Sequence, residues 1–171
     1  LVFGREGGSP WLLNKDKTEL WNGTAWTEVN NLTSGRSLLS GAGTQTSALT
    51  AGGDSPGQTS NVETWDGTCW TEVNNMNLSA YGRAGNGTNS TNGTVSGGRI
   101  AGMPGTALTE SYDGTSWTEV ADLGSPRYNM AVAGTATSGL VMGGSPTGSA
   151  GSTTVEEWSG APLTTVTFTS S

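Results

Sequence analysis

The sequence contains no histidine and a single cysteine, Cys69, in 171 residues. Without histidine, every Ser-His or Cys-His nucleophile pair is excluded, and the commonest metal-ligating side chain is missing. A lone cysteine also excludes an intrachain disulfide and a metal site built on two cysteines. Cys69 occupies a variable position of a repeated motif, where other copies have Ala25 and Ser116. We therefore expect it to be a small packed thiol.

Large aliphatic side chains are scarce. Leu, Ile, Val and Phe make up 26 of the 171 residues, and a fraction this low indicates disorder when it accompanies a high net charge. Here the net charge is only -7, and seven tryptophans provide large apolar areas for burial. The 28 glycines and the abundant Ser, Thr and Asn suit short strands joined by tight turns. The composition therefore predicts one all-β unit.

Basic side chains are also few, with seven Lys and Arg against fourteen Asp and Glu. No basic surface is available to neutralise phosphates, so we expect no nucleic-acid partner and no binding to anionic membrane. No apolar run approaches the length of a membrane span and no signal peptide is visible, so no membrane insertion is expected. The chain starts at Leu1, inside a strand-like segment and without Met, which predicts that an N-terminal part is missing.

One motif recurs along the chain. An aromatic residue is followed by Asn-Gly-Thr or Asp-Gly-Thr, one further residue and Trp-Thr-Glu-Val, and Trp158-Ser159-Gly160 is a degenerate fourth copy. The aromatic residues of the four copies are 44, 47 and 46 residues apart. Self-similarity at a fixed period of this length is typical of propellers and solenoids. The three full copies are Trp21–Val29, Trp65–Val73 and Tyr112–Val120.

Each repeat has the same order of parts. An arginine is followed by a segment of small residues that ends in a glycine pair, and a loop then leads to a strand that ends in the motif's aromatic residue. A last strand begins at the second tryptophan, so we expect about four strands a repeat. The arginines are Arg36, Arg83 and Arg127, and the glycine pairs are Gly52-Gly53, Gly97-Gly98 and Gly143-Gly144.

The Asn-Gly or Asp-Gly dipeptide inside the motif predicts a two-residue type I′ hairpin, because both residues tolerate a positive φ. With Asp66 and Gly67 as the turn, Trp65 would pair with Thr68. Glu63 would then pair with Trp70, and both indoles would lie on one face of the hairpin, where aromatic neighbours stabilise a small sheet.

A four-stranded meander cannot bury both of its faces alone, but meanders stacked radially can, as the blades of a β-propeller do. The order of arginine, Gly-Gly, aromatic residue with Asp or Asn, and Trp about five residues later resembles the kelch repeat over essentially the whole chain. It departs from that repeat in lacking a histidine after the arginine and in having a shorter turn. The motif is also similar to repeat proteins of aquatic phages and environmental bacteria.

We therefore predict an all-β, kelch-like β-propeller with three full four-stranded blades and a partial first blade. Leu1–Gly4 aligns with Leu49–Gly52, so the first blade lacks its opening strand, and 164–169 is expected to be a closing edge strand. The chain is either a small four-bladed ring or the C-terminal part of a larger one, and the second is favoured. The single domain 1–171 divides into blades at about 1–32, 33–76, 77–123 and 124–171.

Glutamates recur at two positions of the repeat. Paired carboxylates catalyse glycoside hydrolysis, but residues present in every blade are spread around a ring, whereas an active site needs a unique constellation. We interpret them as structural groups, as hydrogen-bond acceptors or as partners of the repeated arginines. Glu19, Glu63, Glu110 and Glu156 precede the aromatic residue by two positions, and Glu28, Glu72 and Glu119 follow the second tryptophan by two.

No catalytic, cofactor-binding or metal-ligating residue is predicted. Copper chemistry of the galactose-oxidase kind needs histidine ligands, which the sequence lacks. Sialidase chemistry needs an arginine cluster around a tyrosine, whereas the repeated arginines here occur one to a repeat. An Asp-x-Asp-x-Asp-Gly calcium loop is also missing from the sequence. Sequons for N-glycosylation occur at Asn22, Asn31, Asn77, Asn86, Asn89 and Asn92.

Three functions remain open. We expect a non-enzymatic structural or attachment protein of a phage virion, such as a tail fibre, appendage or decoration, located in the virion or outside the cell. Its partners would be other structural subunits or a host cell surface, glycans included. The alternatives are an extracellular carbohydrate-binding adhesin and the C-terminal part of a propeller hydrolase whose active site lies outside this segment. Recognition is expected in the loops 54–60, 86–92 and 145–153.

Overall fold

The computed structural model describes residues 2–3, 15–146 and 151–160. Within these residues the chain forms fourteen β-strands, arranged in four antiparallel sheets. The described residues contain no helix, and the all-β prediction is confirmed. Glycine pairs and Asx-Gly turns interrupt the chain so often that none of the described strands exceeds six residues.

The strands follow one another in chain order across each sheet, as in a meander. Sheet one contains β1 (Val2–Phe3), β2 (Thr18–Trp21) and β3 (Trp26–Val29). Sheet two contains β4 (Ser40–Gly43), β5 (Ala48–Ala51), β6 (Val62–Trp65) and β7 (Trp70–Val73). Sheet three contains β8 (Ala84–Asn89), β9 (Asn92–Ser96), β10 (Thr109–Tyr112) and β11 (Trp117–Val120). Sheet four contains β12 (Ala131–Gly134), β13 (Gly139–Met142) and β14 (Val155–Trp158).

The expected order of four strands is confirmed in sheets two and three. Among the described residues, sheet one has no strand equivalent to β4, in agreement with the alignment of Leu1–Gly4 with Leu49–Gly52. The closing strand expected at 164–169 lies outside the described residues.

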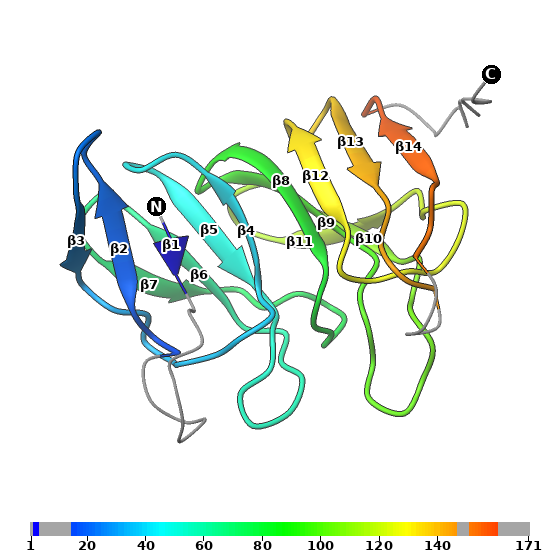
Figure 1. Ribbon diagram of the computed structural model, residues 1–171, viewed down its shortest axis with the longest axis horizontal. Coiled ribbons are helices and arrows are strands. Elements are labelled where there is room, and N and C mark those ends of the chain that lie inside the picture. Colours follow the sequence, from blue (N-terminus) through cyan, green and yellow to red (C-terminus); the bar gives the residue numbers. More distant parts are fainter. Residues whose placement is uncertain (1, 4–14, 147–150, 161–171) are drawn as a thin grey trace.

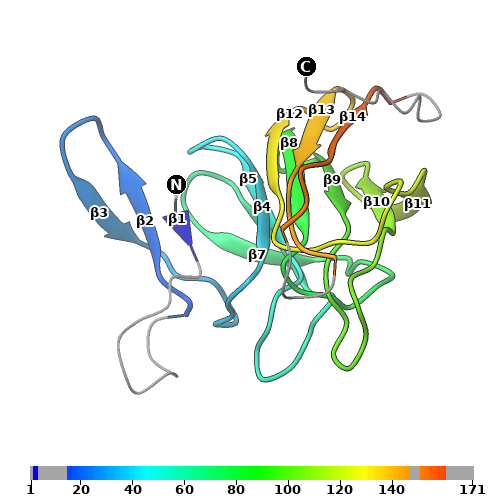
Figure 2. The same cartoon turned by 45° about the vertical axis from the view of Figure 1, so that its right-hand side comes forward.

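The first strands of sheets two, three and four lie side by side, and the sheets spread outward from this row (Figures 1 and 2). Small residues allow this close approach. A Cβ added to Gly85 of β8 would lie 3.1 Å from the carbonyl oxygen of Gly41 in β4. A Cβ on Gly139 would lie 2.0 Å from Nδ2 of Asn86. Sheets one and four lie at opposite ends of the molecule, so the described sheets form an open arc rather than a small four-membered ring (Figure 1).

The core lies between successive sheets. We call the face of each sheet that carries the motif's aromatic residues its aromatic face, and the opposite face its aliphatic face. The aromatic face of sheet three packs on the aliphatic face of sheet two, where Tyr112 and Trp117 join a buried cluster with Leu49 and Val62. Burial of each such aliphatic side chain contributes about 1.5–3 kcal/mol. The same kind of contact places Trp65 and Trp70 of sheet two against Leu32, which follows β3 of sheet one.

The hairpin of the motif differs from the prediction. Trp65 pairs directly with Trp70, so the loop has four residues and the two-residue type I′ turn is wrong. Gly67 has a φ of 98°, whereas Asp66 is not among the residues with positive φ. Asp66 Oδ1 instead accepts the backbone N–H groups of Thr68 and Cys69, each at 2.8 Å. This Asx turn holds the longer loop closed. The two indoles do share a face, with ring centroids 5.4 Å apart.

Candidate functional site

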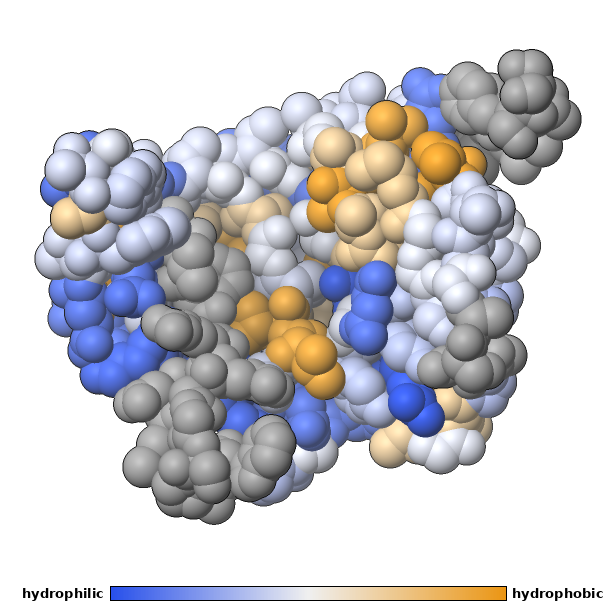
Figure 3. Space-filling model, viewed as in Figure 1, coloured by the Kyte–Doolittle hydropathy of each residue, from blue (hydrophilic) through white to orange (hydrophobic). Residues whose placement is uncertain are grey.

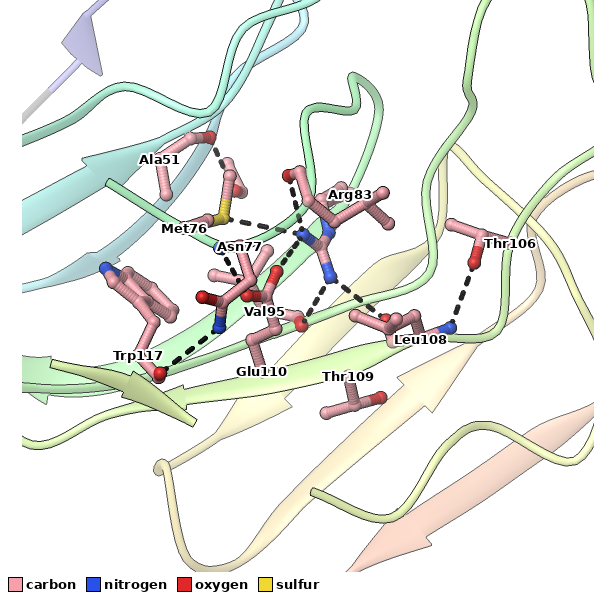
Figure 4. A network of polar contacts seen from close by, with 12 residues as sticks. Ala51, Met76, Asn77, Arg83, Val95, Thr106, Leu108, Thr109, Glu110 and Trp117 are labelled. Carbon is pink, nitrogen blue, oxygen red and sulfur yellow. Dashed lines mark hydrogen bonds and ion pairs between the residues drawn. The ribbon is translucent and has the colours of Figure 1, made fainter. Parts of the chain in front are cut away.

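A buried ion pair joins Glu110 of sheet three to Arg83, which immediately precedes that sheet. Nη1 of Arg83 lies 2.8 Å from Oε2 of Glu110, and their side chains are 1% and 0% exposed. Arg83 also donates to the carbonyl oxygens of Leu108 and Val95, at 3.0 and 3.2 Å. The other carboxylate oxygen of Glu110 accepts the N–H of Asn77 at 2.7 Å (Figure 4). Both oxygens are therefore held, which compensates for burying the carboxylate.

The same arrangement recurs in the two neighbouring sheets. Arg36 pairs with Glu63 at 2.9 Å, and Arg127 pairs with Glu156 at 2.6 Å. Each of these glutamates also accepts a backbone N–H, from Thr33 at 2.8 Å or from Gly124 at 2.6 Å. Pairing with the repeated arginines, one of the two structural roles expected of the repeated glutamates, is confirmed for Glu63, Glu110 and Glu156.

Each of these ion pairs holds the connection between two sheets against the sheet that follows it. The arginine and the backbone N–H donor both belong to the connection between two sheets, whereas the glutamate lies on the third strand of the following meander or its equivalent. Burial lowers the pKa of Arg83, and its carboxylate partner partly opposes that shift. Burial likewise lowers the pKa of Arg36. At 0–1% exposure, the carboxylates of Glu63 and Glu110 lie out of reach of a substrate.

The second set of glutamates lies on the outer strands. Glu72 pairs with Glu63 across the sheet, and Glu119 pairs with Glu110, but Glu72 and Glu119 are exposed. Each facing pair thus combines one buried carboxylate, bound to a guanidinium, with one carboxylate in solvent.

Two loops meet at one end of the sheets. The predicted loop 54–60 connects β5 to β6, and its Gln58 Oε1 accepts the N–H of Ala101 at 2.6 Å. Ala101 belongs to the connection 99–106 between β9 and β10, a loop that follows the glycine pair as expected but was not among the predicted recognition loops. Both loops project from the same edge of the sheets, toward the bottom of the view (Figure 1). Met103 in the second loop is 59% exposed. The sequence signal for this second loop is its position in the repeat, after a glycine pair and before the strand that ends in the aromatic residue.

The expected loop 86–92 is wrong. β8 extends to Asn89 and β9 begins at Asn92, so only Ser90 and Thr91 form the turn. This hairpin lies at the end opposite the 54–60 loop (Figure 1). Asn86 is 5% exposed, which buries its sequon between sheets. In the third expected loop, 145–153, residues 147–150 lie outside the described residues.

A row of hydrogen bonds links the sheets next to their inner strands. Leu38, Gly82 and Asn129 occupy equivalent positions and have φ values of 55°, 63° and 54°. The N–H of Gly82 donates to the carbonyl of Leu38, and the N–H of Asn129 donates to the carbonyl of Gly82, both at 2.8 Å. A positive φ is strained for leucine. We call these three residues the axial row. Beside it, the Arg99 guanidinium lies 5.3 Å from the ring centroid of Tyr128.

Cys69 lies in the exposed hairpin loop of sheet two, so the expected packed thiol is wrong. The equivalent residues in the other copies of the motif, Ala25 and Ser116, did not reveal this exposure, because Ala and Ser tolerate exposed and buried positions alike. The charge of Asp66 raises the pKa of the Cys69 thiol. Sγ also donates a hydrogen bond to Asp66 Oδ2 at 3.6 Å.

Within the described ranges, no group of three or more Cys, Asp or Glu side chains is placed to hold a metal ion. Among the same residues, no helix is long and apolar enough to cross a membrane. No family model matches the chain, and comparison with curated proteins gives no significant match.

Proposed function

We propose that the four sheets are blades of a kelch-like β-propeller and that the chain is part of a larger ring. Two features support this arrangement. The inner strands β4, β8 and β12 lie side by side while the outer strands diverge (Figure 2). The buried ion pairs recur at all three connections between sheets, and the axial row links sheets two, three and four in one repeated way.

The proposed role is that of a non-enzymatic structural or attachment protein of a phage virion, which presents loops to another subunit or to a host surface. The observation that carries this role is the contact between loops 54–60 and 99–106 through Gln58 and Ala101. It places an exposed Met103 on a stiff β frame, and loops on such frames commonly carry recognition.

Two measurements test the role. Immunoblotting of density-gradient fractions from the source culture should find the native protein with the particles. Its presence only in the host's soluble fraction would exclude a virion component. In a cell-binding assay, replacing 100–104 by Gly and Ser at equal length should reduce binding of the labelled chain to host cells. An equal-length replacement of 44–46, in the turn between β4 and β5, is the matched control and should bind normally.

A carbohydrate-binding role is the second candidate, favoured by one observation. Trp21 and Trp26 are 39% and 50% exposed, and their ring centroids lie 5.4 Å apart. Exposed indoles offer flat apolar surfaces on which sugar rings can stack. A glycan array probed with the chain and with Trp26→Ala tests this role. Binding that depends on Trp26 supports it, and an array without any bound glycan rejects it.

A further inference from the structure

The two ends of the arc expose opposite halves of one interface. At the first end, the aromatic face of sheet one carries Trp21 and Trp26, which are 39% and 50% exposed. Their equivalents in sheet two, Trp65 and Trp70, are 1% and 5% exposed because sheet one covers them. The aromatic face of sheet one has no preceding sheet among the described residues.

At the other end, no sheet among the described residues covers the aliphatic face of sheet four. Leu140 pairs with Ala133 on this face and is 37% exposed. Its equivalent in sheet two, Leu49, pairs with Ala42 and is 1% exposed, under Tyr112 and Trp117 of sheet three. Apolar surface is visible over β12 and β13 in the upper right of Figure 3.

The chain itself shows how these two faces fit. Between sheets one and two, and again between sheets two and three, an aromatic face packs on the aliphatic face of the preceding sheet. In both cases the second tryptophan's indole N–H donates across the interface, Trp70 to Thr18 Oγ1 at 2.9 Å and Trp117 to the carbonyl of Asn74 at 3.1 Å. The exposed Trp26 is the corresponding residue of sheet one.

We infer that a second copy of this chain docks head to tail, with its sheet one on sheet four of the first copy. This contact continues the interface that already joins the sheets within one chain. The contact runs head to tail, and it forms a closed pair when a twofold rotation relates the two copies, because sheet one of each copy then meets sheet four of the other. Two copies of four sheets would give eight, within the range of roughly 4–8 blades in which propellers close. The expected assembly is therefore a closed dimer.

The inference uses the proposed blade arrangement but not the attachment role. Sedimentation velocity of the whole chain, over a wide range of concentration, should show a species of twice the monomer mass. Trp26→Glu and Leu140→Glu should each raise the dissociation constant by at least about thirtyfold, the effect of losing an interface hot spot. Thr27→Glu is the matched control, because Thr27 is exposed on β3 and points to the face opposite Trp26.

A mixture of the two variants distinguishes head-to-tail docking from other contacts. Trp26→Glu retains an intact sheet four, and Leu140→Glu retains an intact sheet one, so together they should form a one-to-one heterodimer through one intact interface. Each variant alone should remain monomeric. Circular dichroism and cooperative thermal unfolding establish that both variants fold, which we expect because both side chains are partly in solvent.

Three results would overturn the inference. The first is a wild-type chain that stays monomeric at every concentration. The second is a Leu140→Glu variant that still dimerises, since its aromatic faces would then pair with each other. The third is polymers longer than a dimer in place of the closed pair. None of these results would alter the outcome of the particle-fractionation test of the attachment role.

Discussion

Trp70 and Thr18 lie 52 residues apart in the chain, yet Nε1 of Trp70 donates a 2.9 Å hydrogen bond to Oγ1 of Thr18. Thr18 is 0% exposed and Trp70 is 5% exposed, so the bond lies inside the contact between sheets one and two. It ties the second tryptophan of one motif to the first strand of the preceding motif's hairpin.

Thr18→Val removes this acceptor while keeping the side chain's shape. A buried indole N–H that loses an acceptor costs about 1–3 kcal/mol. We expect the free energy of unfolding, measured by urea titration, to fall by that amount. Thr27→Val, at an exposed position of the same sheet, should change it little. Equal effects of the two substitutions would show that the inter-sheet bond does not stabilise the fold.

Breaking the Arg83–Glu110 pair should lower the free energy of unfolding by more than Thr18→Val does. Arg83→Met leaves a buried carboxylate without its guanidinium, and breaking such a pair typically costs about 3–5 kcal/mol. The double variant Arg83→Met/Glu110→Met should recover much of that loss, because no buried charge remains. Lys17→Met is the control, since Lys17 and Glu28 are 32% and 55% exposed and ion pairs in solvent contribute little to stability. If urea unfolding gives similar losses for Arg83→Met and Lys17→Met, the ion pair does not hold the connection against the sheet.

The strained backbone at Leu38 predicts a stabilising substitution. Its φ of 55° is unfavourable for leucine, whereas Asn129 tolerates the same conformation in the equivalent position. Leu38→Asn should raise the free energy of unfolding by about 1 kcal/mol, and Asn129→Leu should lower it by a similar amount. Thermal unfolding of both variants provides the measurement. Opposite signs would mean that side-chain contacts of Leu38 outweigh its backbone strain.

The Asx turns predict part of the acid sensitivity. Hydrogen bonds from the backbone N–H groups of Cys69 and Thr68 lower the pKa of Asp66, and those of Ser116 and Thr115 lower the pKa of Asp113. A lowered folded-state pKa gives stability that is present above the unfolded value, about 3.9, and is lost as the pH falls through the folded value.

Asp66→Asn/Asp113→Asn should therefore lose less stability than wild type as the pH falls below about 4. The turns should survive, because Asn22 accepts the same two N–H groups at 2.9 Å in the first repeat. Thermal unfolding across this pH range tests the prediction. An unchanged pH dependence in the double variant would show that other carboxylates account for all of it.

The repeat made much of the fold predictable. The order of strands and the pairing of the repeated arginines with Glu63, Glu110 and Glu156 follow from residues that recur at fixed spacing. The hairpin register did not follow, because Asp-Gly also suits a four-residue loop when the carboxylate accepts two backbone N–H groups. That choice depends on the geometry of hydrogen bonds rather than on residue type.

Tertiary position explains the other differences. Residues 86–92 have a loop-like composition, yet most of them are strand, because β8 lies between β4 and β12 where only small side chains fit. The exposure of Trp26 could not be predicted from its motif, which is the same as that of the buried Trp70. Only the neighbouring sheet decides between them.

Hydrogen exchange of the indole N–H groups, followed by NMR, tests the packing of successive sheets most directly. It should be measured in Leu140→Glu, so that any association through sheet four is removed. The account predicts slow exchange for Trp70 and Trp117, whose indoles donate across sheet interfaces, and fast exchange for Trp26. Equally fast exchange of all three would contradict the stacking of each aromatic face on the preceding sheet.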